Sequence, residues 1–282
     1  MTPQDIEAQY DNRAMVPQWA DHMARWQAAS DATRAALKPT VDIVYGPAAR
    51  NRYDLFEARP RRHAMPLIVY IHGGYWMRGD RKDYSFVAKP FVAAGCDVAI
   101  PSYSLCPNIS VAGIVAELQA FTVALWRQTG RRPMVVGHSA GGHLAAALLA
   151  SDWARMPGAD AVPGDVVRSA YSVSGVFDLM PLPSTSLNAA LQLTTSTAKA
   201  VSPRHWPVPA GSRQLVAAVG ADESREFIRQ SLEMARHWSH AGVAAECVLI
   251  PSANHFTVVD EVCRAEGATC RRIIDLARDN AG

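Results

Sequence analysis

The chain has 282 residues, with 28 Lys and Arg, 26 Asp and Glu, and a formal net charge of +2. This length suits one large domain or at most two small ones, and so small a charge argues against a nucleic-acid-binding surface. No run reaches the roughly 18 apolar residues that a membrane-spanning helix needs. The five cysteines include no C-x-x-C pair, which argues against a disulfide framework or a structural zinc site. The first residues lack an apolar signal core, so we expect a cytoplasmic protein without a membrane partner.

The amino-terminal part of the chain predicts helices followed by a hairpin. Residues 6–37 have helical character with a break at Pro17, and we expect this segment to pack on the main body. It is rich in aromatic residues, among them Tyr10, Trp19 and Trp26. Two short runs with alternating apolar residues follow, at 41–46 and 51–58. They predict an antiparallel hairpin.

From residue 66 onward, apolar strands alternate with helices. We expect strands at 66–74, 96–103, 133–139, 167–175, 213–220 and 244–251, and helices at 83–95, 111–130, 140–156, 186–200, 224–242 and 259–280. Unbroken apolar strands are typical of a sheet that is buried on both faces. The alternation predicts a single α/β domain over residues 1–282, with a mostly parallel sheet between helices. The helical segment 1–38 and residues 181–203 or thereabouts are the expected elements of a small helical lid.

A serine stands where a predicted strand turns into a predicted helix. The sequence Gly137-His138-Ser139-Ala140-Gly141 matches the nucleophile-elbow pattern G-x-S-x-G in that context. Such a turn strains the backbone at the serine, and glycine two residues away on each side avoids collisions. A hydroxyl that projects there beside a helix N-terminus indicates a nucleophile. The alternative is a helix-capping serine in a glycine-rich turn.

A serine nucleophile needs a base, and the base needs an acid to orient it. His255 lies in the loop between the last predicted strand and the last predicted helix, which is where this chain order places the base. Other late histidines fall within a predicted helix. The strand at 213–220 is followed by Asp222 and Glu223, side by side. Spacing alone leaves both open as the acid, and each has capping of the next helix as its alternative role.

The glycines after the strand at 66–74 predict hydrogen-bond donors for an oxyanion. In His72-Gly73-Gly74, the glycines allow backbone amides to approach a substrate closely, and the amide of Ala140 would complete the set. Two glycines after a strand are otherwise a simple turn. We expect His72 and His138 to be buried, hydrogen-bonded scaffold residues rather than proton carriers.

These motifs resemble those of the α/β-hydrolase superfamily, and more narrowly its arylformamidase (kynurenine formamidase) branch, close to the hormone-sensitive-lipase-like esterases. The segments that carry the resemblance are "QYDNRAMVP", "IHGGYW", "GHSAGG", "SGVFDLMPL", "ESREFIRQS" and "NHF". The family's acid directly precedes a Ser-x-Glu-Phe segment, so the resemblance implies Glu223, where many relatives have aspartate. Asp222 stays a competitor. Tyr75 stands where lipase-like relatives often have a third glycine.

The resemblance implies a serine hydrolase that cleaves a small aromatic N-formyl amide, such as N-formylkynurenine, through an acyl-enzyme. The alternatives are a broad carboxylesterase for small acyl esters, a related aromatic amide or carbamate hydrolase, and a binding protein that kept the scaffold without the activity. Neither a cofactor nor a metal is needed for this chemistry. A homodimer is left open. Apolar walls for an aryl group would come from four aromatic residues, Tyr75, Trp76, Tyr103 and Phe256.

Overall fold

The computed structural model describes residues 2–61, 65–156, 158 and 162–281. Within them, one sheet has eight strands in the order β1-β2-β4-β3-β5-β6-β7-β8. The strands from β4 to β8 are parallel, and β1 and β2 are antiparallel neighbours at one edge. Their bounds are β1 Thr40–Val44, β2 Arg52–Phe56, β3 Leu67–Ile71, β4 Asp97–Pro101, β5 Pro133–His138, β6 Ser169–Val173, β7 Gln214–Gly220 and β8 Ala244–Ile250. The predicted hairpin and the predicted mostly parallel sheet are confirmed.

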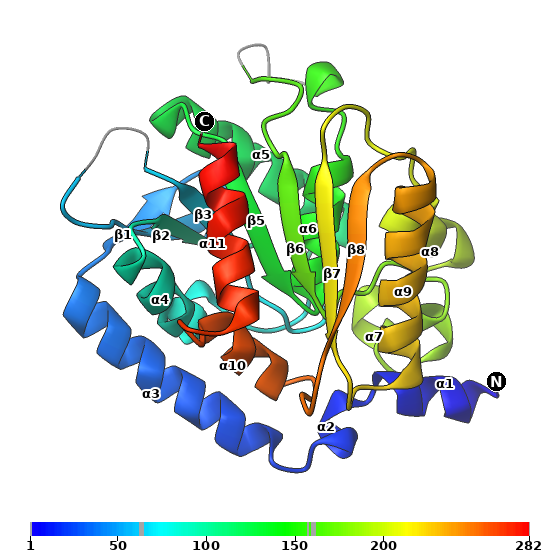
Figure 1. The fold of residues 1–282 in the computed structure, drawn as a ribbon. Coiled ribbons are helices and arrows are strands. Elements are labelled where there is room, and N and C mark those ends of the chain that lie inside the picture. Colours follow the sequence, from blue (N-terminus) through cyan, green and yellow to red (C-terminus); the bar gives the residue numbers. More distant parts are fainter. Residues whose placement is uncertain (1, 62–64, 157, 159–161, 282) are drawn as a thin grey trace.

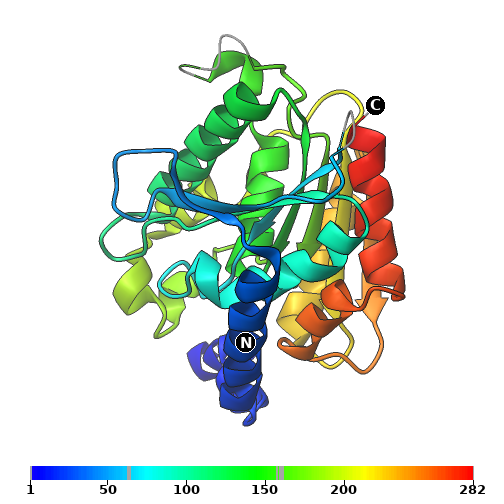
Figure 2. The same ribbon diagram turned by 90° about the vertical axis from the view of Figure 1, so that its left-hand side faces the viewer.

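Helices cover both faces of the sheet (Figure 1 and Figure 2). One apolar core lies between the sheet and α5 (Val111–Thr129), α6 (Ala140–Ala150) and α9 (Arg225–His240). A second core lies between the other face and α3 (Trp19–Leu37), α4 (Ala88–Ala93), α10 (Thr257–Cys263) and α11 (Ala268–Asn280). This arrangement explains the unbroken apolar strands, because the central strands have no face in water.

Strand β8 departs from the prediction of strands buried on both faces. Its residues are mostly exposed or half-buried, and Leu249 is 48% exposed. The reason is its position at the edge of the sheet, where only β7 pairs with it. An apolar run in the sequence therefore overstated the burial of this strand.

Several predicted helices are divided into shorter pieces. The expected helix at 83–95 begins as the 3-10 helix η1 (Arg81–Val87), which a capping box of Asp80 and Asp83 starts. The expected helix at 259–280 is α10 and α11, separated at Gly267, the N-cap of α11. The predicted amino-terminal helical segment forms α1 (Pro3–Tyr10), α2 (Asn12–Met15) and α3. Residues 181–203 contain η3 (Leu182–Ser184), α7 (Asn188–Leu191) and α8 (Thr195–Ala200). Two further short 3-10 helices are η2 (Trp153–Arg155) and η4 (Pro203–His205).

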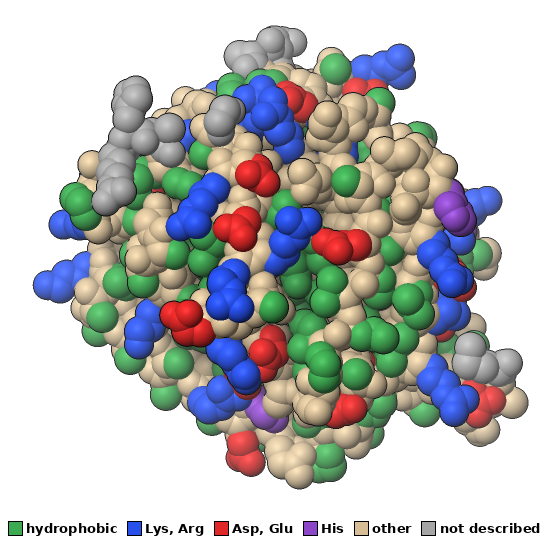
Figure 3. Space-filling model, in the orientation of Figure 1, with side chains coloured by type: hydrophobic (Ala, Val, Ile, Leu, Met, Phe, Trp, Pro, Cys, Tyr) green, Lys and Arg blue, Asp and Glu red, His purple; other side chains and the backbone are tan. Residues whose placement is uncertain are grey.

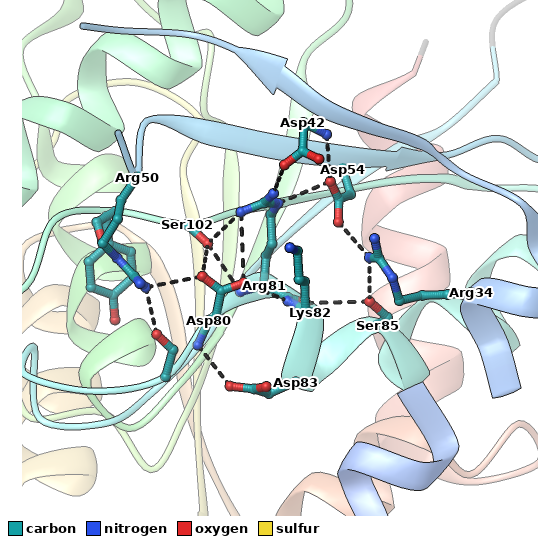
Figure 4. A network of polar contacts seen from close by, with 12 residues as sticks. Arg34, Asp42, Arg50, Asp54, Asp80, Arg81, Lys82, Asp83, Ser85 and Ser102 are labelled. Carbon is teal, nitrogen blue, oxygen red and sulfur yellow. Dashed lines mark hydrogen bonds and ion pairs between the residues drawn. The ribbon is translucent and has the colours of Figure 1, made fainter. Parts of the chain in front are cut away.

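A polar network ties η1 to the hairpin and to α3 (Figure 4). Asp54, whose side chain has no exposed surface, accepts hydrogen bonds from Arg81 Nε at 3.0 Å and from Arg34 Nη1 at 2.6 Å. Arg81 also pairs with Asp42, and Arg50 pairs with Asp80 at 3.3 Å. Residues of β1, β2, α3 and η1 all take part in the network. It therefore holds in place the end of the loop that connects β3 to η1, and this loop forms part of the candidate active site.

The surface in Figure 3 shows Lys and Arg side chains interspersed with Asp and Glu, with no broad field of one sign on this face. That mixture agrees with the small net charge of the sequence. Among the helices of the described residues, none has the length and apolar character that crossing a membrane requires.

Candidate active site

The turn from β5 into α6 holds Ser139 at φ 58° and ψ −119°. A positive φ is rare for a residue other than glycine and marks a strained backbone. A Cβ added at Gly137 would lie 2.0 Å from the carbonyl oxygen of Gly141, and one added at Gly141 would lie 2.0 Å from that of Ile71. Only glycine fits at these two positions. The turn therefore presents the Ser139 hydroxyl at the carboxyl end of β5, beside the N-terminus of α6.

Three side chains named from the sequence meet at this end of the sheet. His255, in the loop between β8 and α10, has Nε2 3.1 Å from Ser139 Oγ and Nδ1 2.7 Å from Glu223 Oε2. All three side chains are buried. Because Nδ1 faces a carboxylate, it carries the ring proton, and Nε2 presents its lone pair to the serine hydroxyl. That is the arrangement in which an imidazole can remove a proton from a hydroxyl.

The carboxylate beside His255 belongs to Glu223 and not to Asp222. The side chain of Glu223 has no exposed surface, and its Oε1 accepts hydrogen bonds from Ser174 Oγ at 2.5 Å and from the amide of Gly220 at 2.7 Å. Asp222 is exposed, and its carboxylate makes no polar contact with any residue that the structure describes. Of the two acids that spacing left open, only Glu223 reaches the histidine.

His138 supports the loop that carries His255. Burial first, and then the charge of His255, lower the pKa of His138 well below its usual value, so its ring is neutral. Its Nε2–H therefore donates to the carbonyl oxygen of His255 at 2.9 Å, and the two rings lie 4.7 Å apart. The expected scaffold role agrees with these contacts. His138 also lines the cavity described below.

The loop after β3 brings Gly73 and Gly74 next to the elbow. A Cβ added at Gly73 would lie 2.8 Å from the carbonyl oxygen of His138 and 3.1 Å from the Cβ of Ser139. Gly74 has φ +115°, a conformation that side chains rarely adopt. Ala140 is the first residue of α6, so its amide has no acceptor within that helix. Of the three residues with predicted oxyanion donors, Gly74 lines the cavity described below, and Gly73 and Ala140 lie directly beside Ser139.

His72 and Tyr103 hold that loop from below. Burial lowers the pKa of His72 to about 4, so the neutral ring donates through Nδ1–H to the carbonyl oxygen of Gly73 at 2.8 Å. Tyr103 stacks on His72 with ring centres 4.4 Å apart, and its hydroxyl donates to the His72 carbonyl oxygen at 2.9 Å. Arg50 continues the support, since it donates to the carbonyl oxygens of Tyr103 and Gly79 at 2.7 and 2.6 Å.

A cavity of about 460 Å³ opens above Ser139 and His255. Tyr75 and Phe256 line it, as the sequence predicted for them. Much of the remaining wall comes from the amino-terminal segment, including Tyr10, Asn12, Arg13, Trp19, Met23 and Trp26. Figure 1 shows α1 and α2 at the same end of the sheet as the loop from β8 to α10. From residues 181–203, only Ser186 and Leu187 are among the described lining residues.

The prediction that Trp76 and Tyr103 form walls of the cavity is wrong. Trp76 has no exposed surface, and its Nε1–H donates to Nδ1 of His143 on α6 at 3.2 Å. Tyr103 is likewise fully buried and stacks on His72. Each ring fills the interior behind the loop, and its polar atom is bonded inward. Both residues therefore support the loop and do not face the cavity.

Polar residues that the sequence did not predict also line the wall, among them Asn12, Arg13 and Arg78. Tyr75 connects the glycine loop to the amino-terminal segment: its hydroxyl donates to the carbonyl oxygen of Tyr10 at 2.6 Å and accepts from Asn12 Nδ2 at 3.0 Å. The one sequence signal for these wall residues was the aromatic character of residues 6–37, which indicated packing on the main body but not on the site.

Within the described ranges, no group of three or more His, Cys, Asp and Glu side chains could hold a metal ion.

Relatives of known annotation share most of their length with this chain. Kynurenine formamidase of Danio rerio is 28% identical over 93% of this chain and 92% of its own length. Kynurenine formamidase of Drosophila melanogaster is 27% identical over 79% of this chain and 76% of its own length.

Solved structures and a family match agree on the fold. A protein from Silicibacter sp. TM1040 that carries a provisional thioesterase label is 29% identical, with a TM-score of 0.86 over 96% of this chain and 98% of that one. An esterase from the bacterial hormone-sensitive lipase family is 19% identical with a TM-score of 0.67, over 94% and 99% of the two chains, and shows the fold alone. The family model for the alpha/beta hydrolase fold matches residues 68–259, which is more than half of the chain. The chain is a hydrolase and belongs to the α/β-hydrolase fold family.

Proposed function

We propose that the protein is a serine hydrolase that removes the formyl group from a small aromatic N-formyl amide, as an arylformamidase of the N-formylkynurenine type does. The observation that carries the proposal is the hydrogen-bonded series Ser139–His255–Glu223 at the floor of a cavity with aromatic walls. The kynurenine formamidases that share most of their length with this chain support the choice of substrate class.

In the proposed reaction, Ser139 Oγ attacks the formyl carbon while His255 Nε2 takes the hydroxyl proton. The carbonyl oxygen becomes an oxyanion, and the amides of Gly73, Gly74 and Ala140 stabilise it. His255 then returns the proton to the nitrogen of the aromatic amine, the C–N bond breaks, and a formyl-serine ester remains. Water, deprotonated by His255, attacks this ester and releases formate and the free serine.

Glu223 acts through His255 in this proposal. It holds the imidazole in the tautomer that presents Nε2 to Ser139 and stabilises the imidazolium that forms in each step. The hydrogen bonds from Ser174 and Gly220 hold the carboxylate in place, since each donates to its Oε1. The amino-terminal segment and residues 181–203 serve as the cover of the cavity within one domain.

Two substitutions and a matched control test the assignment of roles. Ser139→Ala should lower kcat by roughly 10⁴- to 10⁶-fold with the fold retained. Glu223→Gln should lower kcat by about 10²- to 10⁴-fold, because the histidine loses its orienting charge. Asp222→Asn is the control, since that exposed carboxylate is adjacent in the sequence and makes no polar contact within the described ranges. A larger loss for Asp222→Asn than for Glu223→Gln, or full activity of Ser139→Ala, contradicts the assignment.

The second candidate is a carboxylesterase for small acyl esters, since the same groups can cleave an ester and the fold is shared with esterases. The kcat/KM for N-formylkynurenine, measured beside that for p-nitrophenyl acetate, separates the two. Strong ester hydrolysis with negligible deformylation would reject the formamidase. A fluorophosphonate probe should label wild type at Ser139 but not Ser139→Ala, and an unlabelled wild type would instead indicate a binding protein.

A further inference from the structure

Two arginines line the cavity without a carboxylate partner among the residues that the structure describes. Arg78 follows the glycine loop, and a Cβ added at Gly74 would lie 2.8 Å from its Cγ. The side chain therefore starts directly beside the loop that faces Ser139. Its guanidinium has a single hydrogen bond within the described ranges, to the sulfur of Met77 at 3.4 Å. That weak acceptor leaves most of its five N–H donors available.

Arg13 lies on α2, in the amino-terminal part of the cavity wall. Its guanidinium carbon lies 3.9 Å from the centre of the Trp19 ring, so the ring covers one face and leaves the edge N–H groups free. Tyr75 bonds to both Tyr10 and Asn12, which fastens the start of α2 to the loop that carries Arg78. The two charges influence each other: partial burial and then the charge of Arg78 lower the pKa of Arg13, and the charge of Asp11 opposes this shift.

The carboxylates of the same wall are engaged elsewhere. Glu7 accepts from the amide of Ser186 at 2.7 Å, Asp11 from that of Ala14 at 3.0 Å, and Asp83 from that of Asp80 at 3.0 Å. No ion pair joins any of them to Arg13 or Arg78 in the described part of the chain. Arg50 and Arg81, close by in the polar network, are both paired with acids. Arg13 and Arg78 thus place two positive charges at the cavity, and Asp11, which forms no ion pair with either in the described part of the chain, offsets them only in part. An anion bound between the two guanidinium groups would be attracted by both.

We propose that Arg13 and Arg78 form an anion subsite that binds a carboxylate on the leaving-group part of the substrate. Guanidinium groups bind carboxylates through paired, charge-assisted hydrogen bonds, which give both affinity and orientation. This inference rests on the proposed function, because it places a negative charge on the leaving group of the substrate that Ser139 attacks. An acyl compound with an anionic aromatic leaving group is therefore selected over its neutral analogue.

A pair of aryl acetates tests this subsite independently of the formyl group. The probes are 4-methylphenyl acetate, which is neutral, and 4-acetoxyphenylacetate, which adds one carboxylate. Wild type should have the higher kcat/KM for the anionic ester, and added sodium chloride should reduce that preference. Arg13→Gln and Arg78→Gln should each lower kcat/KM by about 10- to 100-fold more for the anionic than for the neutral ester. Arg236→Gln is the control, because Arg236 is exposed on α9 and outside the cavity.

The outcomes separate this inference from the proposed function. If wild type hydrolyses neither ester and the fluorophosphonate probe leaves Ser139 unlabelled, the proposed function fails and the subsite with it. If wild type hydrolyses the neutral ester but shows no salt-sensitive preference for the anionic one, the subsite alone is overturned. This second result needs no variant, so it holds even where a substitution prevents folding. Equal losses on both esters in the arginine variants would overturn the subsite in the same way.

Discussion

His143 makes the stability of the protein depend on pH in a way that can be measured. Its Nε2–H donates to the carbonyl oxygen of Val201 at 2.7 Å, and its Nδ1 accepts from Trp76 Nε1–H at 3.2 Å. The contact with Trp76 requires a neutral ring, because a proton on Nδ1 would face the indole N–H. Burial lowers the pKa of His143 from 6.5 to about 4. The histidine thus accepts the hydrogen bond that joins the Gly73–Trp76 loop to α6 only while it is uncharged.

The sign follows from the lowered pKa. Between pH 6.5 and 4 the unfolded chain binds a proton that the folded protein does not, so the free energy of unfolding falls as the pH falls through this window. For one such histidine, the loss between about pH 7 and about pH 5 is about 2 kcal/mol. His72, whose pKa is also lowered to about 4, adds a similar loss. Wild type should therefore lose about 4 kcal/mol from these two groups over that interval.

Urea unfolding at the two pH values, followed by the fluorescence of the seven tryptophans, measures these losses. His143→Gln should be less stable than wild type at about pH 7, because it loses at least one buried hydrogen bond. Its further loss on going to about pH 5 should be smaller than that of wild type by about 2 kcal/mol. Trp76→Phe is the control: it removes the same hydrogen bond but keeps the buried histidine, so its pH dependence should persist. Identical pH dependence of wild type and His143→Gln would refute this reasoning.

Two further predictions concern the loop and the network that supports it. In Gly73→Ala, the added Cβ would meet the His138 carbonyl oxygen at 2.8 Å, so the loop must shift and kcat of the folded variant should fall by at least about 10-fold. An unchanged kcat would mean that this glycine does not position the oxyanion donors. Asp54→Asn removes a negative charge beside the buried Arg81 and should lower the free energy of unfolding, measured in urea, by about 3 kcal/mol. The control Asp152→Asn, at an exposed ion pair, should lower it by less than about 0.5 kcal/mol. Similar losses for both variants would contradict a structural role for the network.

The sheet and the elbow could be predicted because both depend on strong local patterns. Unbroken apolar runs between helices specify parallel strands, and only glycine fits at 137 and 141 around a strained serine. The position of His255 followed from chain order, and the structure brings its ring to Ser139. Strand β8 was misjudged because an edge strand and a central strand can share the same apolar composition.

The choice between Asp222 and Glu223 could not be made from spacing, because adjacent acids differ only in the direction that the turn gives them. The turn directs Glu223 inward, where the Gly220 amide donates to it, and leaves Asp222 in water. Trp76 and Tyr103 were misplaced for a related reason. Trp76 has φ 57°, so the loop reverses and sends its ring toward α6 and away from the cavity. No periodic pattern in a sequence reports such a reversal.

The cavity wall and the reacting groups come from different parts of the chain, which has a consequence for substrate specificity. The reacting groups stand on loops of the central sheet, whereas Tyr10, Trp19 and Trp26 belong to helices that precede its first strand. Replacements among those early residues would change the shape of the cavity without replacing any of the reacting groups. The amino-terminal helices can therefore set which substrates enter, while the loops of the sheet set which reaction follows.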